Sequence, residues 1–186
     1  DTAIINYFAA KMNIRKRQAL IELNGGSFTI SSGKMQWTLG NVNAVTDIKS
    51  AGDLLGKALK GSVTKESTVK PKYSGTGLLM LEPTYKYLML EDVSTWGPSG
   101  MVIDDGMFLG CDDAVEQKIS ARSNLSSALL GSEGLFNLKL VGNGLALLES
   151  PVPREELVEI SLENDELRID GNYAVAWSGS LEFTVE

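Results

Sequence analysis

The chain has 186 residues, of which 43% are hydrophobic and 22% are charged, and its formal net charge is −7. This length and composition are typical of one globular domain with a sizeable core, and no apolar stretch reaches the roughly 20 residues that a membrane-spanning helix needs. The absence of histidine excludes Ser-His-Asp and Cys-His hydrolysis together with most catalytic zinc sites.

A basic run precedes the first predicted strand. It contains Lys11, Arg15, Lys16 and Arg17. Residues 1–72 hold 11 Lys and Arg against 5 Asp and Glu, whereas residues 73–186 hold 6 against 19. Such asymmetry can mark a surface for phosphate or an acidic partner, but so short a run is more often a solvated face. Because the acidic remainder repels a phosphate backbone, the composition disfavours nucleic acid as a partner.

Strict alternation of apolar and polar residues, the pattern of a half-buried antiparallel strand, occurs four times. The apolar positions are Ala19, Ile21 and Leu23; Met35, Trp37 and Leu39; Val158, Ile160 and Leu162; and Leu181, Phe183 and Val185. Turn-forming residues lie at 24–26, 32–33, 105–106, 164–165 and 170–171. Strands therefore recur about every ten residues, which predicts a mainly β fold.

Two further pairs of short apolar strands are predicted, at 77–81 with 87–90 and at 134–138 with 145–148. Each pair begins with a glycine and contains a turn. The later turn, Gly142-Asn143-Gly144, tolerates positive φ and predicts a tight hairpin, while Pro83 and Thr84 form the earlier turn. Helical spacing of leucine and alanine predicts two short helices, an insert at 53–60 and a second helix at 123–130.

One sequence frame occurs three times. ISSGKMQWTLGNV begins at Ile30 and IDDGMFLGCDDAV begins at Ile103, so that their turn glycines and final valines are each separated by 73 residues. IDGNYAVAWSGSL, from Ile169, fits the frame with small shifts. The repetition predicts a single domain, 1–186, made of three related β units at about 15–49, 73–121 and 131–186. The expected architecture is a β-sandwich, similar to a double-stranded β-helix.

Two groups of residues could carry chemistry. Cys111 is followed by two aspartates that raise a thiol pKa, which favours a packed thiol, and a single cysteine is typical of a reducing compartment. An acidic cluster could form a carboxylate pair or a calcium site, but its spacing matches no calcium loop and structural hydrogen bonds explain it better. The acidic cluster comprises Asp104, Asp105, Asp112 and Asp113. We therefore predict no catalytic residue, metal site or cofactor.

The three tryptophans differ in their surroundings. Packing in a core or an interface explains Trp37 and Trp177, which lie in apolar strands. Trp96 lies in a Gly-Pro loop and has no evident core role, so it is a candidate contact for a ligand or partner. The other candidate contacts are the cations Arg15, Lys16 and Arg17.

Several segments carry a family resemblance. They are GKMQWTLGNV, GMFLGCDDAV, GSEGLFNLKLVGNGLALLES and LRIDGNYAVAWSGSLEF, and the most specific residues are 131–136, 170–171 and 175–177. From about residue 19 onward the chain resembles the altered-inheritance-of-mitochondria family numbered twenty-four. The resemblance implies a fold similar to the tryptophan RNA-binding attenuation protein, whose β-sandwich subunits form rings. It carries over no catalytic residues, and the lysine and arginine motif that grips RNA is not matched.

Taken with the resemblance, these observations predict a non-enzymatic homo-oligomeric scaffold or interaction module. The alternative is a regulatory protein that binds a small ligand or nucleic acid between repeats or subunits. A hydrolase or lyase that uses only carboxylates and lysine is the least favoured hypothesis. A bacterial member is expected in the cytoplasm, whereas fungal relatives are mitochondrial. Because the chain starts at Asp1 and stops before an expected glycine-rich strand pair, further sequence is expected at its ends.

Overall fold

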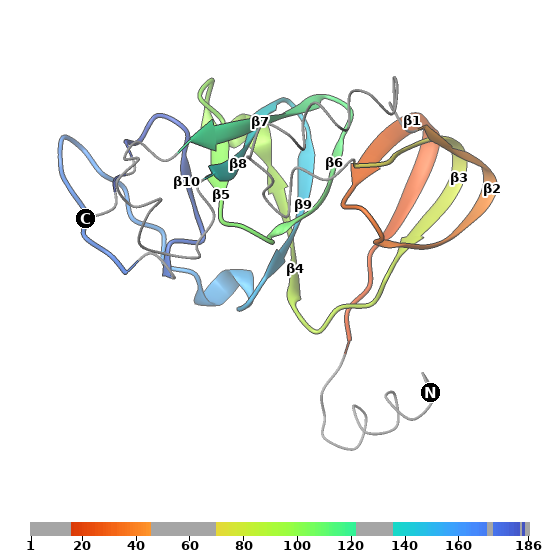
Figure 1. Cartoon of the computed structure of the whole chain (residues 1–186), viewed down its shortest axis with the longest axis horizontal. Coiled ribbons are helices and arrows are strands. Elements are labelled where there is room, and N and C mark those ends of the chain that lie inside the picture. The colour runs from red at the N-terminus through yellow and green to blue at the C-terminus, as the bar shows by residue number, and fades with distance from the viewer. Residues whose placement is uncertain (1–15, 46–69, 122–135, 171–172, 183, 185–186) are drawn as a thin grey trace, which may run out of the picture.

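A computed structural model describes residues 16–45, 70–121, 136–170, 173–182 and 184 (Figure 1). These residues confirm a mainly β fold in which ten strands form two antiparallel sheets. The strands are β1 (Leu20–Ile30), β2 (Met35–Val45), β3 (Lys72–Leu81), β4 (Tyr87–Asp92), β5 (Met101–Ile103), β6 (Phe108–Asp112), β7 (Val115–Ala121), β8 (Phe136–Gly142), β9 (Leu145–Ser150) and β10 (Ala176–Ser178). Two single turns of 3₁₀-helix accompany them, η2 (Val93–Trp96) and η4 (Arg154–Glu156). Among the residues that the structure describes, no helix is long and apolar enough to cross a membrane.

The two sheets pack against each other and enclose the main core. The six-stranded sheet has the order β2-β3-β1-β6-β9-β4, and the four-stranded sheet has the order β10-β5-β8-β7. Buried side chains from both sheets form one cluster, in which Phe108 and Leu148 of the first sheet meet Leu138 and Leu140 of the second. This is the sandwich arrangement that the alternating strands predicted.

A second, N-terminal core lies on the other face of β6 and β9. There Leu109 and Leu147 join buried residues of β1 and β3. Because successive side chains of a strand point to opposite faces, the neighbouring Phe108 and Leu148 face the main core. The two central strands are therefore buried on both faces. Strands β1, β3 and β2 extend beyond them as an arched sheet at the end of the molecule farthest from the C-terminus (Figure 1).

Close contact between β2 and β3 depends on glycine. Gly75 has a φ of +131°, and a Cβ atom there would lie 2.0 Å from the carbonyl oxygen of Asn41. Gly77 has a φ of +152°, and its Cβ would lie 2.1 Å from the carbonyl oxygen of Leu39. A side chain at either position would push the two backbones apart.

The turns of the three repeated segments share one backbone hydrogen bond. In each segment, the backbone carbonyl of the residue after the isoleucine accepts a hydrogen bond from the backbone N–H three positions later. The two turn glycines that the structure describes, Gly33 and Gly106, have φ of +75° and +78°. The bonds run from Lys34 to Ser31 (3.3 Å), from Met107 to Asp104 (3.4 Å) and from Tyr173 to Asp170 (2.9 Å). This likeness agrees with the repeated frame, and the division into three related units stays a prediction.

The predicted turn at 24–26 is wrong. These residues lie inside β1, whose pairing with β3 shifts register between Asn24 and Ser27. Gly25 has a φ of +80°, as is typical of a β-bulge. The Asn-Gly-Gly signal thus marks an irregularity within a strand instead of its end.

The predicted tight hairpin at 142–144 is also wrong. Strands β8 and β9 occur where the sequence predicted them, but they belong to different sheets. In the earlier pair, β3 and β4 share a sheet in which β1, β6 and β9 separate them. Both turns connect strands that do not pair, because the neighbours of a strand depend on distant segments of the chain.

The predicted strand at Val158, Ile160 and Leu162 does not form. The chain there belongs to no strand, and Val158 is 84% exposed. Leu181 also lies outside a strand, while Phe183 and Val185 lie outside the described residues. The helices predicted at 53–60 and 123–130 fall outside the described residues too.

Candidate functional site

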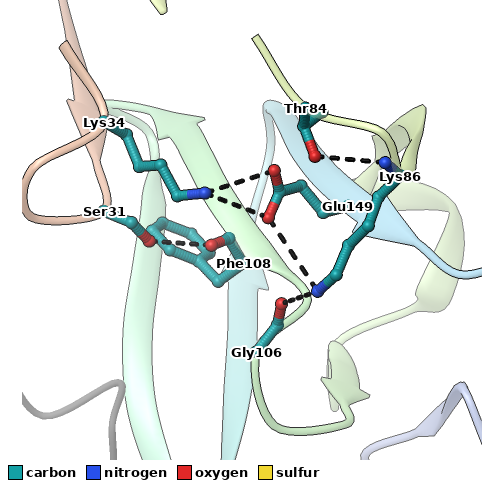
Figure 2. Close-up of polar contacts among 7 residues, drawn as sticks. All are labelled: Ser31, Lys34, Thr84, Lys86, Gly106, Phe108 and Glu149. Carbon is teal, nitrogen blue, oxygen red and sulfur yellow. Dashed lines mark hydrogen bonds and ion pairs between the residues drawn. The ribbon is translucent and has the colours of Figure 1, made fainter. Parts of the chain in front are cut away.

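A buried carboxylate lies between two lysines where β9 meets two turns (Figure 2). The side chain of Glu149 is 6% exposed, and both of its oxygens accept a hydrogen bond of 3.3 Å from the ammonium group of Lys34. Lys86 Nζ lies 4.0 Å from Oε2 of the same carboxylate and donates to the carbonyl of Gly106 at 3.1 Å. We call Lys34, Lys86 and Glu149 the clamp.

The contacts of the clamp join β9 to three other parts of the chain. Lys34 follows the β1–β2 turn, Lys86 precedes β4, and Gly106 lies in the β5–β6 turn. Nearby, the hydroxyl of Ser31 donates to the carbonyl of Phe108 at 2.7 Å, which ties the same turn to β6. Because an unpaired buried carboxylate is strongly disfavoured, the lysines make burial of Glu149 possible. The arrangement attaches the N-terminal strands to the sandwich.

The structure packs Trp96 against the main core. Residues Val93–Trp96 form η2, in which Val93 is 1% exposed and Trp96 is half-buried. At the start of this turn, Asp92 accepts hydrogen bonds from the hydroxyl (2.7 Å) and the amide (2.9 Å) of Ser94. The hydroxyl first, and then the amide, hold the pKa of the Asp92 carboxyl below its usual range. Trp96 therefore packs against the core, which its Gly-Pro surroundings did not reveal, and its contact with a ligand or partner stays a prediction.

Replacement of Trp96 by alanine is expected to lower the free energy of unfolding by about 1–2 kcal/mol, because a half-buried indole leaves the main core. Urea denaturation followed by circular dichroism measures this change. The control is Trp177→Phe, which keeps an aromatic ring on half-buried β10. Its free energy of unfolding should fall less than that of Trp96→Ala. An unchanged urea midpoint in Trp96→Ala would show that packing of the indole does not stabilise the core.

The basic residues at the first strand lie on tyrosines. The ammonium group of Lys16 is 5.1 Å from the ring centroid of Tyr85, and the guanidinium of Arg17 is 3.7 Å from that of Tyr87. Arg17 also donates to the carbonyl of Tyr85 at 3.1 Å. These cation–π contacts fix the entry of the chain into β1. Arg15 lies outside the described residues.

The structure does not bring the predicted contact residues into one site. Arg17 lies at the start of β4 and Trp96 lies beyond its end. Strand β4 has 6 residues, so the two positions are roughly 20 Å apart at the rise of an antiparallel strand. A single small ligand therefore cannot touch both residues of the same chain, and binding between subunits stays a prediction.

Cys111 is a packed thiol, as the sequence predicted. It is fully buried in the main core, donates weakly to the carbonyl of Val115 at 3.8 Å and accepts from the side-chain amide of Gln117 at 3.4 Å. Burial raises the pKa of the thiol to about 12, with smaller contributions from the flanking aspartates. Desolvation, more than those charges, keeps the sulfur protonated and unreactive.

The acidic cluster of the sequence is divided in space. Asp105 lies before β6, whereas Asp112 and Asp113 lie at its other end. A carboxylate oxygen of Asp112 accepts from the backbone N–H of Leu145 at 2.8 Å, and Asp113 pairs with Lys72, whose hydrogen bond lowers the Asp113 pKa. Within the part of the chain that the structure describes, no group of His, Cys, Asp or Glu could hold a metal ion.

The outer face of the arched sheet carries an exposed apolar patch. Residues directly opposite one another in antiparallel strands share a face. The pairing places Leu20, Met80 and Trp37 in one row and Leu78 and Leu39 in the next, where the β1 position holds the exposed Glu22. The outer patch consists of Leu20, Trp37, Leu39, Leu78 and Met80. Leu20 on β1 is 53% exposed, and Trp37 and Leu39 on β2 are 40% and 62% exposed. The prediction that Trp37 packs in a core is therefore wrong. The alternative, that Trp37 packs in an interface, stays a prediction.

The outer patch has a polar boundary. The next row of the same face consists of Asn24, Thr76 and Asn41. An apolar area rimmed by polar side chains is typical of a surface that contacts another macromolecule. The sequence contained one signal for it, the alternation Met35, Trp37, Leu39, but alternation cannot say which face of a strand will be covered.

Comparison with known proteins gives consistent matches. The family model for mitochondrial biogenesis AIM24 matches residues 11–186. Uncharacterized protein M6_Spy0233 of Streptococcus pyogenes serotype M6 is 29% identical over 178 residues, which cover 89% of this chain and 68% of that protein. The crystal structure of protein SPYM3_0169 from Streptococcus pyogenes matches with a TM-score of 0.53 and 25% identity. That match covers 75% of this chain and 66% of the other, so the chain spans about two thirds of its length.

Proposed function

The chain belongs to the mitochondrial biogenesis AIM24 family, which is described by a cellular process and not by a reaction, and we propose that it is a non-enzymatic interaction module that assembles into a homo-oligomer. The outer patch carries this proposal. It exposes leucine and tryptophan side chains on one face of the sheet, where a partner surface can cover them. Its mechanism is surface complementarity: apolar side chains leave water when the partner binds.

The ionisable groups of the described residues support a role without catalysis. The most buried carboxylate, Glu149, is neutralised by lysines, and the thiol of Cys111 is protonated and enclosed. Each therefore has a structural function that accounts for its position. The sequence also lacks histidine, the usual general base near neutral pH.

Finer features belong to the same proposal. The two packed antiparallel sheets suit a fold related to the tryptophan RNA-binding attenuation protein, whose subunits form rings. We place bacterial members, such as those that the streptococcal relatives represent, in the cytoplasm and fungal members in mitochondria. In both settings the module would act by holding proteins together.

Native mass spectrometry of the purified protein tests the proposal. At low collision energy we expect a closed oligomer whose mass is a whole multiple of the chain mass of 20.0 kDa. A dilution series separates specific assembly from association in the spray, since a specific oligomer persists at micromolar concentration. A monomer at every concentration contradicts the proposal. An additional mass on each subunit would instead favour the regulatory, ligand-binding alternative.

A further inference from the structure

We propose that β2 is the edge at which two copies of this chain meet. In this arrangement the β2 strands of both copies run antiparallel beside each other about a two-fold axis, and the two six-stranded sheets continue into one. The inference rests on the proposed homo-oligomer and names the surface that forms it. Pairing of this kind uses backbone hydrogen bonds for affinity and the adjacent side chains for specificity.

Strand β2 is an unprotected edge. It has 11 residues, MQWTLGNVNAV, and among the described residues it pairs only with β3. None of its residues is charged or proline, although such residues normally prevent edge strands from pairing with other chains. It lies at the outermost end of the sheet, away from the sandwich (Figure 1).

The other edge strands are protected. At the opposite edge of the same sheet, β4 has 6 residues and ends in Glu91 and Asp92. In the four-stranded sheet, β7 carries Glu116 and Lys118, and β10 has only 3 residues. Length and lack of charge therefore distinguish β2 from every other edge that the structure describes.

Charge identifies a second copy as the occupant. In a two-fold contact each residue meets a residue of the same surface, so charged side chains near the axis meet like charges. With a net charge of −7, two copies repel each other unless they meet where the surface is neutral. β2 is such a surface, whereas two copies of β4 would bring carboxylates together.

The exposure of the outer patch agrees with a missing neighbour strand. Leu78 and Leu39 are opposite each other in the same row. Leu78 lies on β3, between two strands, and is half-buried, while Leu39 has a neighbour on one side and is 62% exposed. A strand placed beside β2 would cover the free flank of Leu39 and of Trp37. Edge pairing thus buries Leu39, the most exposed residue of the patch.

The substitution Leu39→Lys tests the pairing. It places a cation at the middle of β2, where it would meet the positive charge of the second copy. The matched control is Leu90→Lys on β4, because Leu90 is also 62% exposed and lies on the opposite edge of the same sheet. Sedimentation equilibrium should show a dissociation constant for Leu39→Lys at least tenfold above that of the wild type and of Leu90→Lys. Circular dichroism and thermal melting check that both variants are folded.

Hydrogen exchange gives an independent measurement on the unaltered chain. Backbone amides of β2 should exchange more slowly at high than at low protein concentration, while amides of β4 should not change. An oligomer that survives Leu39→Lys, with β2 exchange independent of concentration, overturns the pairing and leaves the proposed function intact. A wild-type monomer overturns both. Slow exchange along β2 in that monomer would mean that the same chain covers the strand.

Discussion

Replacement of Gly75 by alanine is expected to lower the free energy of unfolding by about 3 kcal/mol or more, which is a large effect for one methyl group. Two penalties add. The φ of +131° is disfavoured for any residue with a side chain, and the new Cβ would lie 2.0 Å from the carbonyl oxygen of Asn41. That oxygen belongs to the backbone of the partner strand and cannot rotate away, so β2 must separate from β3.

Gly33→Ala is the matched control for Gly75→Ala. Gly33 also has a positive φ, +75°, but nothing lies within 4 Å of its added Cβ. It should therefore lose only about 1–2 kcal/mol, the cost of a left-handed conformation. Urea denaturation of both variants measures the difference. Equal losses would show that the strands adjust without cost and that close backbone contact does not hold β2 to β3.

Removal of one partner from the clamp is expected to be asymmetric. Lys34→Met leaves Glu149 buried beside only the more distant Lys86, and we expect a loss of about 2–3 kcal/mol. Glu149→Gln should lose about 1–2 kcal/mol, because Lys34 and Lys86 are 34% and 48% exposed and can turn to water. The buried member of the pair thus determines which deletion is worse.

A double-mutant cycle isolates the interaction within the clamp. We expect the variant with both Lys34→Met and Glu149→Gln to be more stable than the sum of the single losses implies, since the double variant leaves no buried carboxylate without its partner. Thermal and urea unfolding at neutral pH give the coupling free energy. Lys118→Met, which removes an exposed pair with Glu116, is the control and should change stability little. Additive losses would contradict direct pairing of Lys34 with Glu149.

Local sequence signals located most of the strands but not their neighbours. The run around Ile21 and Leu23 is in β1, and the run around Trp37 is in β2, because alternation reports a strand with two unlike faces. Which strands pair depends on packing between distant segments. The tight turn at 142–144 therefore connects two different sheets, although its glycines and asparagine are the residues of a hairpin.

The alternation at Val158 and Ile160 shows that a strand pattern alone does not produce a strand. The residues have the period of a strand, yet the described chain offers them no strand to pair with, and both side chains are mostly exposed. A periodic pattern states only that one face could be buried. Burial itself requires a partner elsewhere in the chain, and the local sequence does not identify that partner.

The clamp had a partial signal in the sequence. Glu149 follows the apolar run Leu145-Ala146-Leu147-Leu148, and a carboxylate next to buried leucines needs a cation. The partner, Lys34, lies 115 residues away, so no local pattern could identify it. The outer patch was hidden for a related reason: Trp37 in an alternating strand is expected in a core until the topology shows which face remains uncovered.

The burial of β6 and β9 on both faces affects how the protein unfolds. Leu109 and Leu147 hold the N-terminal core, while Phe108 and Leu148, one position away, hold the main core. Neither cluster can melt without removing strands from the other. We therefore expect that the arched sheet does not unfold alone on heating and that the described strands share one cooperative unfolding transition.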